Sequence, residues 1–205
     1  MIGKWNRSVI ATYVGMLFAV AAIFLLFANL TGYAMMCFMA AGICDLFDGT
    51  IARMCKRTEE EKNFGIQLDS LVDVVSFIML PVVMVIKLAG ITWYAAAACA
   101  MYTVFGVARL AYFNVCQEES EDKDSPIKYY TGMPVTYAAL IFPAIYLLNR
   151  LFTGQVIGLL MCIAMEISAL LFILKLKFIK PGKKGYIFLM LLAVALFVLY
   201  IIFGR

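Results

Sequence analysis

Seven long apolar segments constrain the fold of this chain more than any other feature. A helix rises about 1.5 Å per residue, so roughly 20 apolar residues cross the hydrocarbon core of a bilayer. The segments cover residues 8–29, 32–54, 65–88, 91–115, 133–149, 154–178 and 185–203. Hydrophobic residues make up 65% of the chain, whereas soluble domains have about 45–50%. The sequence therefore predicts an all-α polytopic membrane protein of about seven transmembrane helices, built as a single domain over residues 1–205.

The distribution of positive charge predicts the orientation of these helices. If the N-terminus is cytoplasmic, fourteen of the seventeen Lys and Arg residues lie on the inner side, and only Lys87, Arg150 and Arg205 lie outside. We therefore expect a cytoplasmic N-terminus and a C-terminus on the opposite side. The charged inner segments 53–64 and 116–130 mix both signs, which is typical of solvated loops. The net charge of +4 follows membrane topology and does not indicate nucleic-acid binding.

Histidine is absent from the sequence, which excludes a Ser-His-Asp triad, a histidine base and a His-ligated zinc site. The six cysteines form no CxxC pair and fall mostly in or beside apolar segments. We expect them to be small packing residues.

Five of the thirteen acidic residues lie inside apolar segments, where a charge is costly and commonly functional. They are Asp45, Asp48, Asp69, Asp73 and Glu166. Spacings of three and four place the first pair on one face of its helix and the second pair on one face of the next. A short inner connection makes these helices neighbours, so the four aspartates are predicted to meet in a polar pocket near the cytoplasmic surface. Glu166 stands alone, and we expect it to have a structural role.

Four clustered carboxylates repel one another and need compensation. Hard divalent cations prefer oxygen ligands, and two such ions among four carboxylates are common in phosphoryl transfer. Interhelical hydrogen bonding or helix capping is the alternative role for these residues. Small residues (Gly49, Ala52 and Gly65) leave room for a ligand beside the acids. Arg53 follows directly and is suited to contact phosphate.

The segments DLFDGTIAR (45–53) and GIQLDSLVD (65–73) resemble the signature of the CDP-alcohol phosphotransferases, D-x2-D-G-x2-A-R followed by G-x3-D-x3-D. All eight fixed positions are filled. The spacer of eleven residues between Arg53 and Gly65 is longer than is typical of the family. We expect its additional residues to lie in the charged loop.

The resemblance implies an integral enzyme of the cell membrane that uses two divalent cations, Mg²⁺ or Mn²⁺. It implies Asp45, Asp48, Asp69 and Asp73 as metal ligands, with Asp73 also the general base. The CDP pocket is implied to include Asp45, Gly49, Ala52, Arg53 and Gly65. Resemblance alone implies a homodimer.

A second resemblance narrows the substrates. The segments ARLAYFNV (108–115) and KYYTGMPVTYAALIFP (128–143) are similar to the membrane phosphatidylserine synthase subgroup, which implies CDP-diacylglycerol as donor and L-serine as acceptor. Serine carries a carboxylate and an ammonium group, so its site needs a cation and hydrogen-bonding groups. Candidates beside the metal site are Arg109, Asn114, Lys128 and Tyr130. Positive-inside anchoring and an aromatic belt are the alternative explanation for these residues.

The sequence thus predicts a metal-dependent transfer of a phosphatidyl group to serine, with release of CMP at the cytoplasmic face. One alternative keeps the chemistry and changes the acceptor to glycerol 3-phosphate or inositol phosphate, or the donor to an archaeal ether lipid. Another is a divalent-cation transporter, although no other acidic residue except Glu166 continues a polar path across the membrane. A non-catalytic scaffold would leave the aspartates unexplained.

Overall fold

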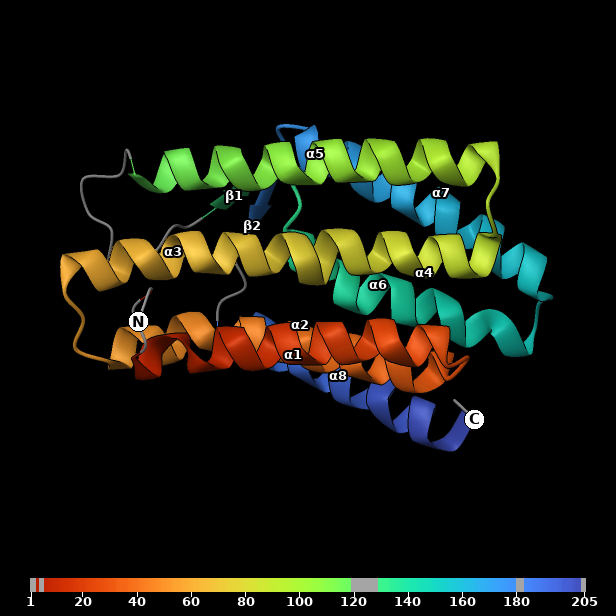
Figure 1. Ribbon diagram of the computed structural model, residues 1–205, viewed down its shortest axis with the longest axis horizontal. Helices are drawn as coiled ribbons and strands as arrows, with labels where there is room; N and C mark the ends of the chain where they lie inside the picture. Colours follow the sequence, from red (N-terminus) through yellow and green to blue (C-terminus); the bar gives the residue numbers. More distant parts are fainter. Residues whose placement is uncertain (1–2, 4–5, 119–128, 180–182, 204–205) are drawn as a thin grey trace.

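The computed structural model describes residues 3, 6–118, 129–179 and 183–203, and in them the chain forms an elongated bundle of roughly aligned helices (Figure 1). The third helix runs without a break from α3 through a π-helical turn, Val74–Met79, which we call the π-helical segment, into α4. A short 3-10 turn precedes α1, and two others flank α6. The main helices are α1 (Ile10–Phe27), α2 (Thr31–Met54), α3 (Glu59–Asp73), α4 (Leu80–Ala89), α5 (Trp93–Glu118), α6 (Ala138–Tyr146), α7 (Gly154–Ile173) and α8 (Lys183–Phe203).

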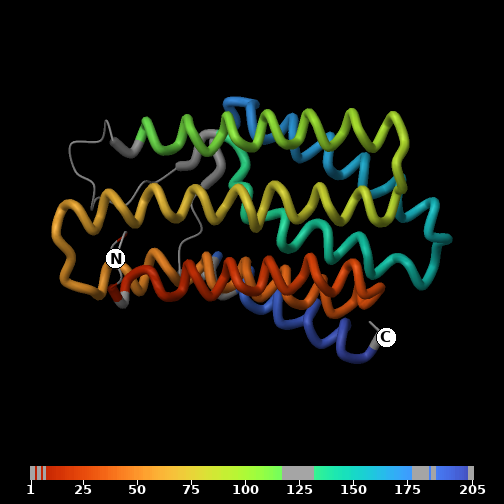
Figure 2. The backbone as a smooth tube through the Cα atoms, viewed as in Figure 1, coloured from red at the N-terminus to blue at the C-terminus, as the bar shows by residue number. Residues whose placement is uncertain are grey.

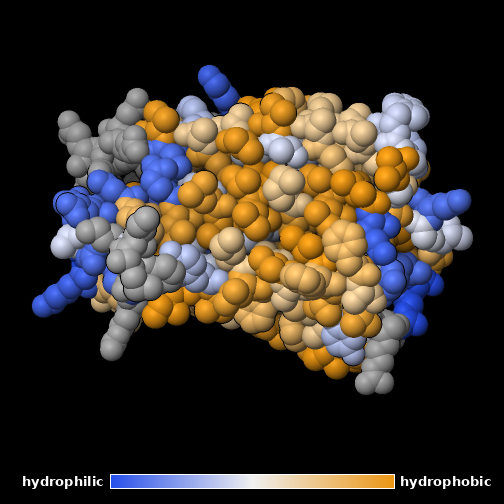
Figure 3. Space-filling model, viewed as in Figure 1, coloured by the Kyte–Doolittle hydropathy of each residue, from blue (hydrophilic) through white to orange (hydrophobic). Residues whose placement is uncertain are grey.

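In the described part of the chain, five helices are long and apolar enough to cross a membrane, which confirms the helical membrane class. They are α1, α2, the continuous helix Glu59–Ala89, α5 up to Cys116, and α7. The other two of the seven expected spans contain shorter apolar helices, Val135–Arg150 and Phe188–Ile202. Apolar side chains cover the middle of the visible face, and hydrophilic side chains gather toward both ends (Figure 3). The direction of insertion stays a prediction.

The helices form three groups across the bundle. Helices α5 and α7 pack together on one side, and α1, α2 and α8 lie on the other, with the α3–α4 rod and α6 between them (Figure 1). Helix α1 begins at one end of the bundle, and α8 ends at the other (Figure 2). The end of α2, the start of α3 and the end of α5 share one end of the molecule (Figure 1).

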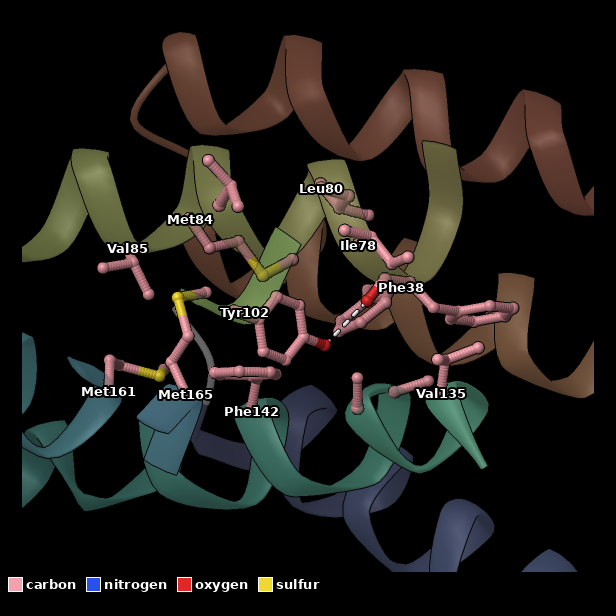
Figure 4. Close-up of a cluster of buried hydrophobic side chains, with 14 of the residues drawn as sticks. Phe38, Ile78, Leu80, Met84, Val85, Tyr102, Val135, Phe142, Met161 and Met165 are labelled. Carbon is pink, nitrogen blue, oxygen red and sulfur yellow. Dashed lines mark hydrogen bonds between the residues drawn. The ribbon is translucent and has the colours of Figure 1, made fainter. Parts of the chain in front are cut away.

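The core lies where these groups meet. Tyr102 of α5 is fully buried, and its ring packs edge-on against Phe142 of α6, with centroids 6.0 Å apart. Methionines of α4 and α7, among them Met84 and Met161, fill the space around the two rings (Figure 4). The hydroxyl of Tyr102 donates a hydrogen bond of 2.7 Å to the carbonyl oxygen of Phe77 in the π-helical segment (Figure 4). This bond fixes α5 against the third helix at mid-bundle.

The expectation of a solvated loop over residues 53–64 is wrong for most of that segment. Helix α2 continues to Met54, and α3 already begins at Glu59. A capping box starts α3: the Thr58 hydroxyl accepts from the amide of Glu61 at 3.3 Å, and the Glu61 carboxylate accepts from the amide of Thr58 at 2.8 Å. The long spacer therefore extends α3 toward solvent and leaves a short connection.

A two-stranded sheet departs from the all-α expectation. Strand β1 (Tyr129–Thr131) pairs antiparallel with β2 (Lys177–Ile179). The predicted span 154–178 consequently ends at Ile173, where helix α7 stops. The pairing joins the segment before α6 to the segment before α8, so it holds two distant connections side by side.

Gly132 makes this junction possible. Its φ is +78°, and its amide donates to the carbonyl of Leu176 at 2.9 Å. A Cβ added here would lie 2.5 Å from the carbonyl oxygen of Phe172. The position therefore excludes a side chain both by conformation and by contact with backbone.

We predict that Gly132→Ala lowers the free energy of unfolding by about 3 kcal/mol, because the folded state of the variant bears two costs. One is the strain of an alanine at positive φ, and the other is the clash of its Cβ with the Phe172 carbonyl oxygen. Thermal unfolding in detergent measures the loss. Gly90→Ala is the matched control, since Gly90 also has a positive φ, +75°, but an added Cβ meets no atom within 4 Å. Equal losses in the two variants would contradict the role of the Phe172 contact.

Candidate metal centre

The four intramembrane aspartates meet between α2 and α3. Carboxylate oxygens of Asp45, Asp48 and Asp69 lie within 4.8 Å of one another. Asp73 lines the same cavity. The helical spacing predicted this convergence, and the structure brings all four residues together.

The aspartates border a small cavity with room for about one water molecule or one ion. Asp48 and Asp73 are each only 8% exposed. Apart from the four aspartates, the cavity is lined by Thr12, Gly15, Ala41, Val72, Ser76 and Phe77.

The chemistry of the donor set fits a divalent metal. The ligand atoms are carboxylate oxygens, which Mg²⁺ and Mn²⁺ prefer. Buried anions at these separations repel one another strongly unless a cation lies among them. The residues Asp45, Asp48 and Asp69 would hold such an ion, and Asp73, which lines the same cavity, would be a further ligand.

Sequence reasoning missed Thr12 of α1. Its hydroxyl donates a hydrogen bond of 3.1 Å to Oδ2 of Asp48, and the side chain is buried. The bond orients that carboxylate from outside the α2–α3 pair. A signal exists in the sequence: Thr12 begins a stripe of mostly small residues, with Gly15 and Ala19, at helical spacing along α1. It is the polar member of a face that packs closely on α2.

Helix α5 supplies a cation and an amide beside the acids. The Arg109 side chain is buried, lies 5.1 Å over the ring of Phe113 and interacts electrostatically with Asp45. Asn114 accepts a 2.9 Å hydrogen bond from the hydroxyl of Ser70, the neighbour of Asp69 in the sequence. Both residues were predicted near the site; they lie next to the aspartate-bearing helices but are not among the residues that line the cavity.

For the other two residues predicted near the acceptor, a place at the site stays a prediction. Lys128 lies outside the described residues. Tyr130 belongs to β1, and only its backbone is described.

Except for Asp45, the predicted CDP-contact residues lie outside the cavity, on the last turns of α2 and the middle of α3. Gly49 and Arg53 are exposed, Ala52 and Gly65 are half-buried, and only Asp45 of this set lines the cavity. The Arg53 guanidinium donates to the hydroxyl of Thr50 at 3.3 Å. Beyond its own helix turn, no atom of the described residues lies within 4 Å of a Cβ added to Gly49. The backbone there is consequently open to a ligand.

A larger apolar pocket adjoins the acidic cavity. Helices α2, α6 and α8 line it, with side chains such as Met39, Leu140 and Met190. Asp45 lines both spaces. The arrangement therefore suits an amphipathic ligand whose charged group meets the aspartates and whose apolar part lies among these helices.

Glu166 lies apart from this centre. It is half-buried on α7 and does not line the cavity. Its position agrees with its exclusion from the predicted site.

Comparison with known proteins identifies relatives along most of the chain. The sequence model of the family described as CDP-alcohol phosphatidyltransferase matches residues 5–203. A CDP-diacylglycerol–serine O-phosphatidyltransferase of Helicobacter pylori (strain J99) is 31% identical over 143 residues, which cover 65% of this chain and 57% of that protein. A protein of the same name from Saccharomyces cerevisiae is 32% identical over 117 residues, or 55% of this chain and 41% of its own length. The chain thus spans about half the length of these curated relatives.

We predict that Thr12→Val weakens Mn²⁺ binding about tenfold, because loss of a group that orients a ligand typically costs this much affinity. Titration of the detergent-solubilised protein, with free Mn²⁺ followed by electron paramagnetic resonance, measures the change. Thr103→Val is the control: the Thr103 hydroxyl donates to the carbonyl of Cys99 within α5 and is not part of the cavity. Unchanged affinity in Thr12→Val would contradict a role in the metal centre.

Proposed function

We propose that this chain, which belongs to the CDP-alcohol phosphatidyltransferase family, transfers a phosphatidyl group from CDP-diacylglycerol to the hydroxyl of L-serine and releases CMP. The observation that carries the proposal is the cavity of four carboxylates inside an apolar helical bundle. The names of the relatives favour serine as the acceptor.

The reaction needs a positively charged group that offsets the negative charge of the phosphates. Divalent cations, when bound, offset the charge of the pyrophosphate and of the leaving CMP. In this proposal Asp45, Asp48 and Asp69 hold these ions together with Asp73. The residues around the cavity keep it narrow, which limits water that would compete with serine for the phosphatidyl group.

Asp73 is proposed as the general base. Its carboxylate accepts the proton of the serine hydroxyl as the serine oxygen attacks the β-phosphorus. The bond from that phosphorus to the CMP oxygen breaks on the opposite side, in line with the attack. Burial of Asp73 beside Asp45 supports this role, because the carboxyl group lies at the cavity wall and not in bulk solvent.

Helix α5 is proposed to bind the acceptor. Arg109 supplies a positive charge for the serine carboxylate, and Asn114 supplies an amide for its polar groups. Their position beside the aspartates supports the assignment. Lys128 and Tyr130 stay candidates for the same task.

The donor is proposed to lie across the acidic cavity and the apolar pocket. The apolar part of the donor next to its diphosphate is assigned to the pocket between α2, α6 and α8, and the diphosphate is assigned to the aspartates next to Asp45. The cytidine group is assigned to the open end of α2, near Gly49, Ala52 and Arg53, and to Gly65 across the connection. We place this end at the cytoplasmic face, from the distribution of positive charge. A homodimer is proposed from resemblance alone.

A labelled-acceptor assay tests the function. Purified protein receives CDP-diacylglycerol, Mn²⁺ and labelled serine, with labelled glycerol 3-phosphate in a parallel tube. We expect label to move from serine into lipid and the transfer to stop with EDTA. Incorporation of glycerol 3-phosphate alone would change the acceptor, and absence of CMP release in both tubes would favour cation transport.

The same assay tests the base. Asp73→Asn is expected to lower kcat by about 10³-fold, because the amide cannot accept the proton, while the protein still folds and binds Mn²⁺ weakly. Glu166→Gln is the matched control, an intramembrane carboxylate outside the cavity, and should keep its activity. An active Asp73→Asn enzyme would remove Asp73 as base.

Arg109→Met is predicted to raise KM for serine about tenfold and to leave KM for CDP-diacylglycerol nearly unchanged, because a charge-assisted contact to the acceptor is lost. Steady-state kinetics with each substrate varied in turn separates the two constants. Equal increases in both would indicate that Arg109 supports the aspartates instead of the acceptor.

A further inference from the structure

Ser76 carries a buried hydroxyl that the proposed reaction does not use. The residue is 1% exposed and lines the acidic cavity. Its Oγ atom has no hydrogen-bond partner in the described part of the chain. Buried hydroxyls are nearly always hydrogen-bonded, because an unsatisfied one loses its bonds to water and gains none in return.

Ser76 does not form the hydrogen bond that usually satisfies a serine hydroxyl in a helix. A helical Ser or Thr commonly donates to the carbonyl four residues earlier. Thr103 of α5 does this, with a bond of 2.7 Å to the carbonyl of Cys99. Ser76 makes no such bond, so its hydroxyl stays available to whatever the cavity contains.

The surrounding structure fixes the position of Ser76. It lies in the π-helical segment that follows Asp73 directly. Tyr102 holds that segment by its bond to the next residue, Phe77 (Figure 4). Gly106 allows α5 to approach, since a Cβ there would lie 2.9 Å from the side chain of Ile78. Single π-helical turns in helices are frequent at functional sites.

The cavity walls limit what the hydroxyl can bind. The Thr12 hydroxyl already donates to Asp48. The other walls, apart from the carboxylates, are apolar or glycine. An oxygen atom inside the cavity is therefore the partner that a free hydroxyl donor fits.

We propose that Ser76 is a positioning residue of the metal centre, whose hydroxyl hydrogen-bonds a water molecule coordinated to the divalent cations between the aspartates. The inference rests on the proposed function for the presence of cations. It adds a residue of the third helix that acts through a water molecule and not as a direct ligand. Groups of this kind orient the coordination shell, and their loss typically weakens metal binding.

Binding of Mn²⁺ to the full chain in detergent tests the proposal. Ser76→Ala is expected to weaken Mn²⁺ binding about tenfold. Without metal, its melting temperature should be unchanged or slightly higher, because an unsatisfied buried hydroxyl has been removed. The rise in melting temperature on adding Mn²⁺ should be correspondingly smaller. A purely structural serine would give the opposite pattern, with a loss of stability in the metal-free protein.

Two further variants make the result decisive. Ser76→Cys keeps nearly the same size but donates weakly, so it should also lose affinity for Mn²⁺. Ser168→Ala removes another buried serine hydroxyl, on α7 outside the cavity, and should bind Mn²⁺ as the parent does.

The outcomes separate this inference from the proposed function. If the parent chain binds Mn²⁺ and both Ser76 variants bind it equally well, the role of Ser76 is overturned and the metal centre stands. If the parent chain binds no Mn²⁺, both proposals are overturned. Tenfold losses in the two Ser76 variants, with Ser168→Ala unaffected, support the positioning role.

Discussion

Burial of four carboxyl groups inside an apolar bundle is the constraint on which the rest of this structure depends. Anions in such a place destabilise the fold unless neighbours or ions offset their charge. The chain supplies one hydroxyl from Thr12 and one positive charge from Arg109. These groups come from α1 and α5, which both lie outside the α2–α3 pair. The acidic centre therefore depends on side chains from α1, α2, α3 and α5 together. This requirement constrains how the four helices pack.

Close packing between helices meets that requirement without a strong hydrophobic driving force, because lipid is as apolar as the side chains. Small residues stand at the contacts. A Cβ on Gly42 would lie 2.6 Å from that of Ala139, and one on Gly158 would lie 2.7 Å from the Cα of Ala89. Such positions bring α2 to α6 and α7 to the end of α4. The bundle thus gains its cohesion from contact area, and the polar centre gains a rigid frame.

The aspartates could be predicted from sequence because spacings of three and four are properties of one helix. Thr12 and Ser76 could not, since their place at the site depends on how α1 and the π-helical segment pack against other helices. The start of α3 is a different case: its capping box is visible at Thr58, but a count of charges alone assigns the segment to a loop. The strands β1 and β2 are too short to show the alternation of apolar and polar residues that predicts a strand. Each also pairs with a segment that is distant in the chain.

That short sheet also has a consequence for synthesis. Strand β1 leaves the ribosome before α6 and α7, whereas its partner β2 follows them. The hydrogen bonds between β1 and β2 can therefore form only after both helices have been synthesised. The pairing then closes a loop of the chain that contains α6 and α7, and α8 begins a few residues beyond that loop.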